Sequence, residues 1–212
     1  MKQRIGFALL LAVLILGGFG GSAHAAAVLS LNSANGDVWD LQYRLKVLNY
    51  YQQPLDGKYG VSTAAAVRKF QQNYGLHADG KTGSQTWSAL KKYSLNLNEM
   101  DTMARIIYSE ARGEPYEGQV AVGAVVMNRI QSSKFPNNIR DIVFQPGAFT
   151  AVQDGQFWLK PNRTAYLAAF DAVRGWDPTH GSYYYFNPNT STNSWIWSRP
   201  QTVKIGNHIF AK

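Results

Sequence analysis

The chain has 212 residues, of which 45% are hydrophobic and 16% are charged, and its formal net charge is +8. It contains no cysteine, which excludes disulfides, thiol nucleophiles and thiolate zinc sites. This composition is that of a folded protein with one large or two small domains, and the positive charge favours an anionic partner.

The N-terminal segment has the three-part layout of a secretory signal peptide. Lys2 and Arg4 precede an apolar run from residue 5 to residue 20, and Ala23-His-Ala25 follows as a cleavage site. The alternative is a membrane anchor, but a transmembrane helix needs roughly 20 apolar residues. We predict a signal peptide over residues 1–25 and an exported protein without a membrane span. Export argues against nucleic acid, so cell-wall glycan is the expected anionic partner.

Residues 35–93 contain an internal repeat. Asp56-Gly-Lys-Tyr-Gly60 returns 23 residues later (79 − 56) as Asp79-Gly-Lys-Thr-Gly83. Each copy leads to a serine, Ser62 or Ser84, that can cap a helix. A third helix is predicted upstream from the apolar spacing of Val38, Leu41, Leu45 and Leu48. The pattern predicts a compact three-helix bundle.

This bundle resembles the small peptidoglycan-binding domain attached to many cell-wall hydrolases. The resemblance rests on both Asp-Gly turns and on Gly36-Asp37, Leu41-Gln42, Val67-Arg-Lys-Phe-Gln71 and Trp87. It implies a docking role, with residues 56–59 and 79–82 as candidate contacts. The bundle offers no catalytic group, because its one histidine, His77, lies in a turn.

The second domain begins with a helix that places Glu110 in its last turn. Asn98 and Asp101 fit an N-cap pair. Glu110 lies beside the apolar stripe, and Gly113 and Pro115 then end the helix. The negative end of the helix dipole and apolar neighbours both favour the protonated carboxyl, which a general acid needs. The alternative is a surface glutamate paired with a neighbouring arginine, Arg105 or Arg112.

Farther along, residues 117–130 predict a central buried helix, residues 162–175 a further helix, and residues 202–210 a short hairpin. Aromatic residues concentrate at Tyr183-Tyr-Tyr-Phe186, Trp195 and Trp197. Aromatic faces pack in any core, but they also stack on sugar rings. The cluster exceeds what a core of this size needs.

Residues 99–212 resemble the catalytic domain of the spore cortex-lytic enzyme and cell-wall hydrolase family. The motifs are Glu110-Ala-Arg-Gly-Glu-Pro-Tyr-Glu-Gly-Gln119, Asn128-Arg129, Gln145-Pro-Gly147, Tyr184-Tyr-Phe-Asn-Pro188, Trp195-Ile-Trp-Ser-Arg-Pro200 and Ile205-Gly-Asn-His208. Thr150 stands where the family pattern leads us to expect serine. The implied fold is mainly α, with the three-helix bundle followed by an α-rich domain like lysozyme and lytic transglycosylases.

The resemblance implies cleavage of the glycan strands of spore cortex peptidoglycan during germination. Glu110 is the implied acid, and Phe149, Thr150, Tyr185 and Asn187 are expected to line the subsites. No metal or cofactor is expected. The implied location is the spore cortex, the outer surface of the inner forespore membrane or the cell wall, with a membrane-associated companion protein.

Three alternatives stay open. A hydrolase with two carboxylates needs a partner for Glu110, and Glu114, Asp154 and Asp171 are candidates. If Glu110 acts alone, Arg112 and Glu114 are expected to hold the loop that follows it. An N-acetylmuramoyl-L-alanine amidase needs about three zinc ligands, and this domain has only His180 and His208 as histidines. The last alternative is a wall-binding protein without enzymatic activity.

Overall fold

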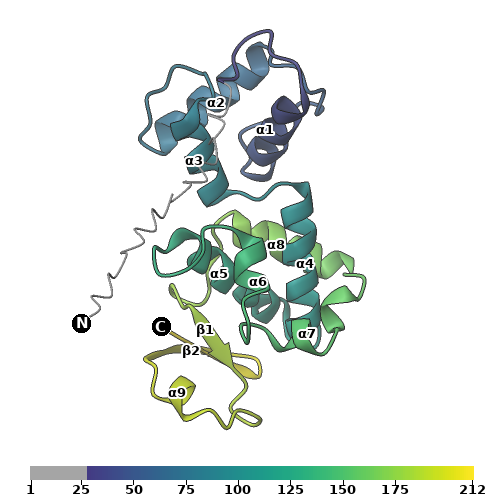
Figure 1. Cartoon of the computed structure of the whole chain (residues 1–212), viewed down its shortest axis with the longest axis vertical. Helices are drawn as coiled ribbons and strands as arrows, with labels where there is room; N and C mark the ends of the chain where they lie inside the picture. Colours follow the sequence, from purple (N-terminus) through teal and green to yellow (C-terminus); the bar gives the residue numbers. More distant parts are fainter. Residues whose placement is uncertain (1–27) are drawn as a thin grey trace, which may run out of the picture.

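The computed structural model describes residues 28–212 as two helical units, one on top of the other (Figure 1). The upper unit contains α1 to α3, and the lower unit contains α4 to α9 and a small sheet. The predicted signal peptide, residues 1–25, lies outside the described residues. Within residues 28–212, no helix has the length and hydropathy needed to cross a membrane.

The upper unit is the predicted three-helix bundle. It consists of α1 (Gly36–Val47), α2 (Val61–Asn73) and α3 (Ser84–Tyr93). The predicted serine caps are wrong, because α2 and α3 begin directly after Gly60 and Gly83 and neither has a side-chain cap. The helices enclose a fully buried apolar core that includes Leu41, Leu45, Val67, Phe70 and Leu90.

Two buried glutamines explain the sequence repeat. Gln42 Nε2 donates to Asp56 Oδ1 (2.8 Å), and its Oε1 accepts from the amide of Gly57 (2.9 Å). Gln71 does the same in the second copy, donating to Asp79 Oδ1 (3.0 Å) and accepting from the amide of Gly80 (2.8 Å). Each Asp-Gly turn is therefore held from inside the bundle. The bond from Gln42 is the main cause that lowers the pKa of Asp56, whereas the pKa of Asp79 is lowered chiefly by the backbone amide of Lys81 and then by Gln71.

Arg44 joins the two units. Its side chain is 2% exposed and bonds to Asp40 on α1, to the carbonyl of Ser94 and to Glu99 (2.9 Å). Glu99 also completes a capping box with Asn96 at the start of α4 (Leu97–Ala111). The predicted cap of Asn98 with Asp101 is wrong by two residues; Asp101 instead pairs with Arg105.

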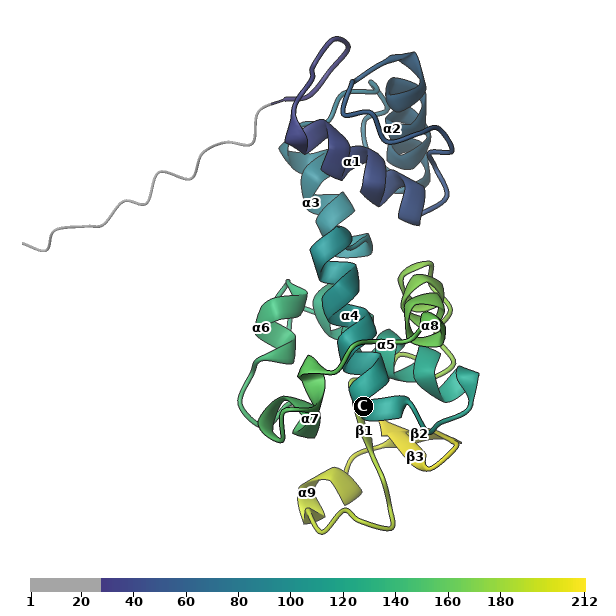
Figure 2. The same ribbon diagram turned by 90° about the vertical axis from the view of Figure 1, so that its right-hand side faces the viewer.

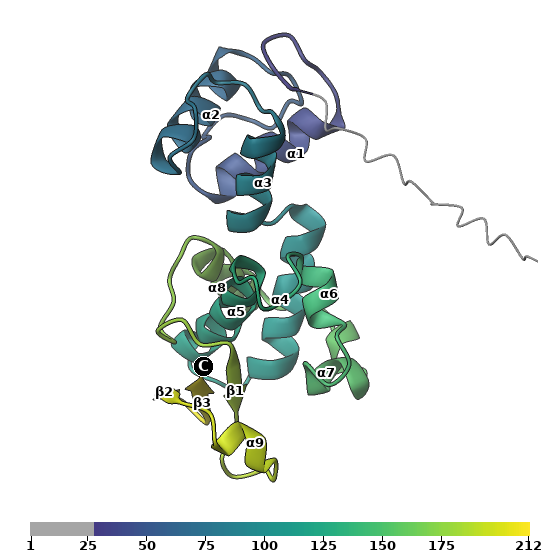
Figure 3. The ribbon, with the colours of Figure 1, turned by 60° about the vertical axis from the view of Figure 1, so that its left-hand side comes forward.

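The lower unit is organised around the buried helix α5 (Tyr116–Gln131), which confirms the prediction of a central helix. It packs against α4 and α8 (Arg163–Val173). At Gly123 a Cβ would lie 2.9 Å from that of Ala172, so only glycine permits this approach of α5 to α8. The short elements α6 (Ile139–Val143), α7 (Thr150–Gln153) and η1 (Gln156–Trp158) lie on the other side of α4 (Figures 2 and 3).

The predicted hairpin is confirmed as β2 (Gln201–Ile205) and β3 (His208–Ala211), and it gains a third strand, β1 (Tyr184–Phe186). The antiparallel order is β1-β3-β2, and α9 (Ser194–Trp197) lies between β1 and β2 in the chain. Phe210 of β3 and Ile205 of β2 pack on Ala121 and Val125 of α5. The sheet is thereby fixed against the central helix, next to the C-terminal end of α4 (Figure 1).

Candidate active site

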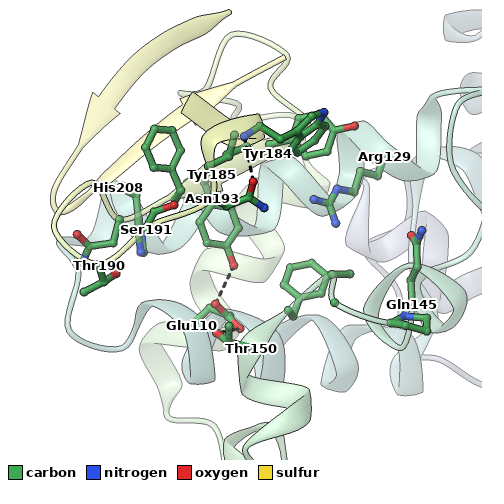
Figure 4. A pocket seen from close by; sticks show the side chains of 18 of the residues that line it. Glu110, Arg129, Gln145, Thr150, Tyr184, Tyr185, Thr190, Ser191, Asn193 and His208 are labelled. Atoms are coloured by element: carbon green, nitrogen blue, oxygen red, sulfur yellow. Dashed lines mark hydrogen bonds between the residues drawn. The ribbon is translucent and has the colours of Figure 1, made fainter. Parts of the chain in front are cut away.

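A pocket of about 700 Å³ lies between the end of α4, α5, the loop before α7, and the sheet with its following loop (Figure 4). All five residues predicted from the sequence line it: Glu110, Phe149, Thr150, Tyr185 and Asn187. They come from three segments that are far apart in the chain. The packing of the sheet on α5 brings these segments together.

Three donors hold the Glu110 carboxyl group. The backbone amide of Ala151 (2.9 Å) and the hydroxyl of Thr150 (3.4 Å) donate to Oε1, and the hydroxyl of Tyr185 donates to Oε2 (3.1 Å). The side chain is half-buried in the last turn of α4, as predicted. The sequence indicated apolar neighbours around this carboxyl group. In the structure, three polar groups donate hydrogen bonds to it.

The alternative of a surface ion pair does not describe Glu110. Arg105 pairs with Asp101 (2.7 Å), and Arg112 donates to Gln156 (2.6 Å). Within residues 28–212, Glu110 forms no ion pair. Its carboxyl group therefore faces the pocket, with hydrogen bonds as its only polar contacts to the described protein.

Tyr185, at the centre of β1, is a fixed hydrogen-bond donor. Its ring lies 5.0 Å from the ring of His208 and 5.8 Å from that of Phe210. Burial, followed by the charge of Glu110 and the hydrogen bond to it, raises the pKa of Tyr185 well above its usual value. The phenol is thus neutral and donates at any physiological pH.

The other predicted residues have different surroundings. Phe149 is only 3% exposed, and its ring lies beneath the guanidinium group of Arg129 at 5.2 Å, so it forms the floor of the pocket rather than an open stacking face. Thr150 keeps the hydroxyl expected at its position and directs it at Glu110. Asn187 uses its Oδ1 to accept from the amide of Asn189 (2.9 Å), which shapes the loop after β1.

None of the candidate second carboxylates lines the pocket. Glu114 accepts from the backbone amide (2.9 Å) and side-chain amide (3.0 Å) of Asn207, which joins the α4–α5 loop to the β2–β3 turn. Asp171 accepts from Tyr116 (2.6 Å), and Asp154 from Gln156. Of the residues that the structure describes, Glu110 is the only acidic one in the pocket wall.

The lining residues that were not predicted as site residues include two buried titratable ones, Arg129 and His208. Arg129 is 6% exposed and His208 is 9% exposed. Burial lowers the pKa of His208, and its buried Nδ1 has no partner among residues 28–212. The sequence signal that points to Arg129 is a charged residue that closely follows the apolar run Val120–Met127 of α5. In the described part of the chain, no three His, Asp or Glu side chains cluster as metal ligands.

Comparison with known proteins identifies both units. Residues 34–90 match the family described as putative peptidoglycan binding domain, and residues 113–211 match the family described as Cell Wall Hydrolase. The spore cortex-lytic enzyme of Bacillus cereus is 39% identical over 90% of this chain and 88% of its own length. The second match begins three residues after Glu110 (113 − 110), so it carries no information on that residue.

Two solved structures resemble the lower unit. The catalytic domain of the Bacillus cereus SleB protein superimposes with a TM-score of 0.54 at 55% identity, covering 56% of this chain and 93% of that one. The catalytic domain of the germination-specific lytic transglycosylase SleB from Bacillus anthracis also gives a TM-score of 0.54, at 56% identity, with 56% and 97% covered.

The fold, the pocket and these matches define an enzyme of the cell wall hydrolase class that carries an N-terminal binding module. Its extended similarity to the Bacillus cereus enzyme is more specific. The chain belongs to the spore cortex-lytic enzyme family. Membership of an enzyme family removes the interpretation as a purely adhesive wall protein.

Proposed function

We propose that this protein cleaves the glycan strands of spore cortex peptidoglycan during germination, as a lytic transglycosylase with Glu110 as its single acid and base. The observation that carries the proposal is the isolation of Glu110: three donors hold its carboxyl group in a pocket where the described residues supply no other acid. A mechanism with one carboxylate fits this site, whereas a two-carboxylate hydrolase would find no second acid among the described residues that line the pocket.

In the proposed reaction, Glu110 first donates its proton to the glycosidic oxygen, and the bond between that oxygen and the sugar C1 breaks. The sugar's own 6-hydroxyl then attacks C1 and returns its proton to Glu110, which closes a 1,6-anhydro ring without water. Tyr185 and the amide of Ala151 stabilise the negative charge that develops on Glu110 during proton donation. The same bonds fix the direction of the carboxyl group.

Peptidoglycan as the substrate is supported by the binding module and by the cortex-lytic relatives. Cortex degradation places the site of action outside the cytoplasmic membrane, and we infer export through the predicted signal peptide at residues 1–25. A membrane-associated companion protein is part of the same hypothesis. The amidase alternative has less support, because the wall of the pocket contains one histidine, His208, among the described residues.

The test is Glu110→Gln, which keeps the shape of the side chain and removes its proton. We expect loss of cortex lysis by at least about 100-fold, since general acid catalysis contributes roughly 10²–10⁴-fold. Glu117→Gln, an exposed position on α5 outside the pocket, is the matched control and should keep full activity. Full lysis by Glu110→Gln would overturn the proposal.

Mass spectrometry of the released fragments tests the reaction type. A transglycosylase yields anhydro ends, which are one water lighter than the reducing ends made by a hydrolase. Free amino groups on the stem peptides without new sugar ends would instead support the amidase.

A further inference from the structure

Arg129 is a buried cation in the wall of the pocket. It lies near the end of α5, is 6% exposed, and donates from Nε to the carbonyl of Tyr183 (2.7 Å). Within residues 28–212 it forms no ion pair, and its two terminal nitrogens donate no hydrogen bond to protein. These terminal nitrogens are not among the enclosed side-chain atoms without a partner in the described chain, so their four N–H groups open into the pocket, where a ligand can accept from them.

Aromatic rings hold the guanidinium group in place. Its central carbon lies 5.2 Å from the ring of Phe149, 5.4 Å from that of Phe135 and 5.5 Å from that of Tyr184. These cation–π contacts stabilise the charge, but they leave the terminal N–H groups without acceptors. Figure 4 shows the guanidinium end directed into the pocket, on the side of Tyr184 and Gln145. The result is a positioned double donor facing the pocket.

A planar donor pair of this kind suits a carboxylate or another carbonyl oxygen. In peptidoglycan, muramic acid carries a lactyl group and the alternating N-acetylglucosamine does not. The lactyl carboxyl is free, linked to a peptide, or closed into a lactam, and each form presents a carbonyl oxygen. A donor that requires this oxygen would distinguish the two sugars of the strand.

We propose that Arg129 binds the carboxyl-derived oxygen of the muramic acid lactyl group and thereby sets which glycosidic bond lies beside Glu110. The inference rests on the proposed function, because it takes a peptidoglycan strand as the ligand. It deepens that function by assigning a specificity-determining residue on α5, opposite the catalytic carboxyl group on α4.

Arg129 also has a structural contact that the test must separate from ligand binding, because its Nε bond links α5 to the residue before β1. Arg129→Met keeps the apolar stem, and Arg129→Lys keeps the charge but loses the paired donors. Arg174 provides a matched control. Its Nε also donates to a backbone carbonyl, that of Val47 (2.9 Å), and its guanidinium carbon lies 5.3 Å from a ring, that of Phe170, yet it lies outside the pocket.

The experiment measures binding rather than turnover, by calorimetry, with the full chain carrying Glu110→Gln. Three ligands are compared: peptide-free glycan fragments with free lactyl carboxylates, the same fragments with these carboxyls reduced to alcohols, and fragments containing muramic lactam. We expect Arg129→Met to weaken binding of the carboxylate or lactam fragments by about 10- to 100-fold, the contribution of a charged hydrogen bond. The affinity for the reduced fragments should fall by less than about threefold in Arg129→Met. The affinity of Arg129→Lys for the carboxylate and lactam fragments should lie between that of the parent and that of Arg129→Met.

The carboxylate and lactam ligands distinguish which oxygen is recognised, and a loss on either supports the proposal. Equal losses on carbonyl-containing and reduced fragments, or no loss at all, would overturn it, as would an equal loss in Arg174→Met. Near-ultraviolet circular dichroism checks folding; if Arg129→Met does not fold, Arg129→Lys on the same ligands decides. Lysis by Glu110→Gln alone would contradict the proposed function while leaving this binding result valid.

Discussion

Tyr185→Phe isolates one hydrogen bond in the candidate active site. The change removes only the hydroxyl that donates to Glu110 Oε2, while the ring keeps its contacts with His208 and Phe210. A hydrogen bond to a charged group contributes about 1.5–3 kcal/mol. At 3.1 Å this bond is slightly long for an O–H donor, so we take the lower part, about 1.5–2 kcal/mol.

If that energy stabilises the charge that develops on Glu110, kcat should fall by about 10- to 30-fold, since 1.36 kcal/mol corresponds to tenfold. KM should change little, because Tyr185 acts through Glu110. The free energy of unfolding should fall by less than about 1 kcal/mol, because water in the open pocket can replace the lost donor. Steady-state kinetics on soluble cortex fragments, with urea unfolding in parallel, measures both quantities.

Tyr183→Phe is the matched control, since it removes a hydroxyl two residues upstream that does not line the pocket. It should retain wild-type kcat. A kcat of Tyr185→Phe within twofold of wild type would refute the reasoning that this hydroxyl supports the acid. A large loss of folding stability would instead show that the hydroxyl serves the packing of the sheet.

Three further changes test other contacts. Thr150→Val should lower kcat by less than about threefold, because its 3.4 Å contact is weaker than the Ala151 amide bond; a loss as large as that of Tyr185→Phe would contradict this ranking. Arg44→Met should reduce the free energy of unfolding in urea by about 2–3 kcal/mol. Breaking a buried ion pair usually costs about 3–5 kcal/mol, but here both carboxylate partners are 30% exposed, which lowers the cost. The control Lys46→Met, on the exposed side of α1, should have little effect. Burial depresses the pKa of His208, so the unfolded chain binds a proton more readily than the folded chain, and stability should decline as the pH falls below about 6.5. In thermal melts between pH 7 and 5, His208→Phe should make stability depend less steeply on pH. The same pH dependence in both proteins would contradict the role given to His208.

Local sequence patterns predicted the helices because the forces that define them act over a few residues. Apolar spacing located the central helix α5, and the position before Gly113 and Pro115 placed Glu110 in the last turn of α4. The predicted cap at the start of α4 was wrong, because Asn96 and Asn98 are both followed three residues later by an acid and the local pattern does not choose between them. Arg44 decides between them, since its bond to Glu99 reaches across 55 residues of sequence.

The sequence by itself determined the mainly α fold, the repeated bundle and the identity of the candidate acid. Tertiary structure decided what surrounds that acid: the hydroxyl of Tyr185 comes from 75 residues away and the amide of Ala151 from 41. It also decided that Arg129 faces the pocket without an acidic partner among residues 28–212. Helical periodicity describes neighbours three or four residues apart, whereas these contacts depend on β1 pairing with β3 and on the sheet packing against α5.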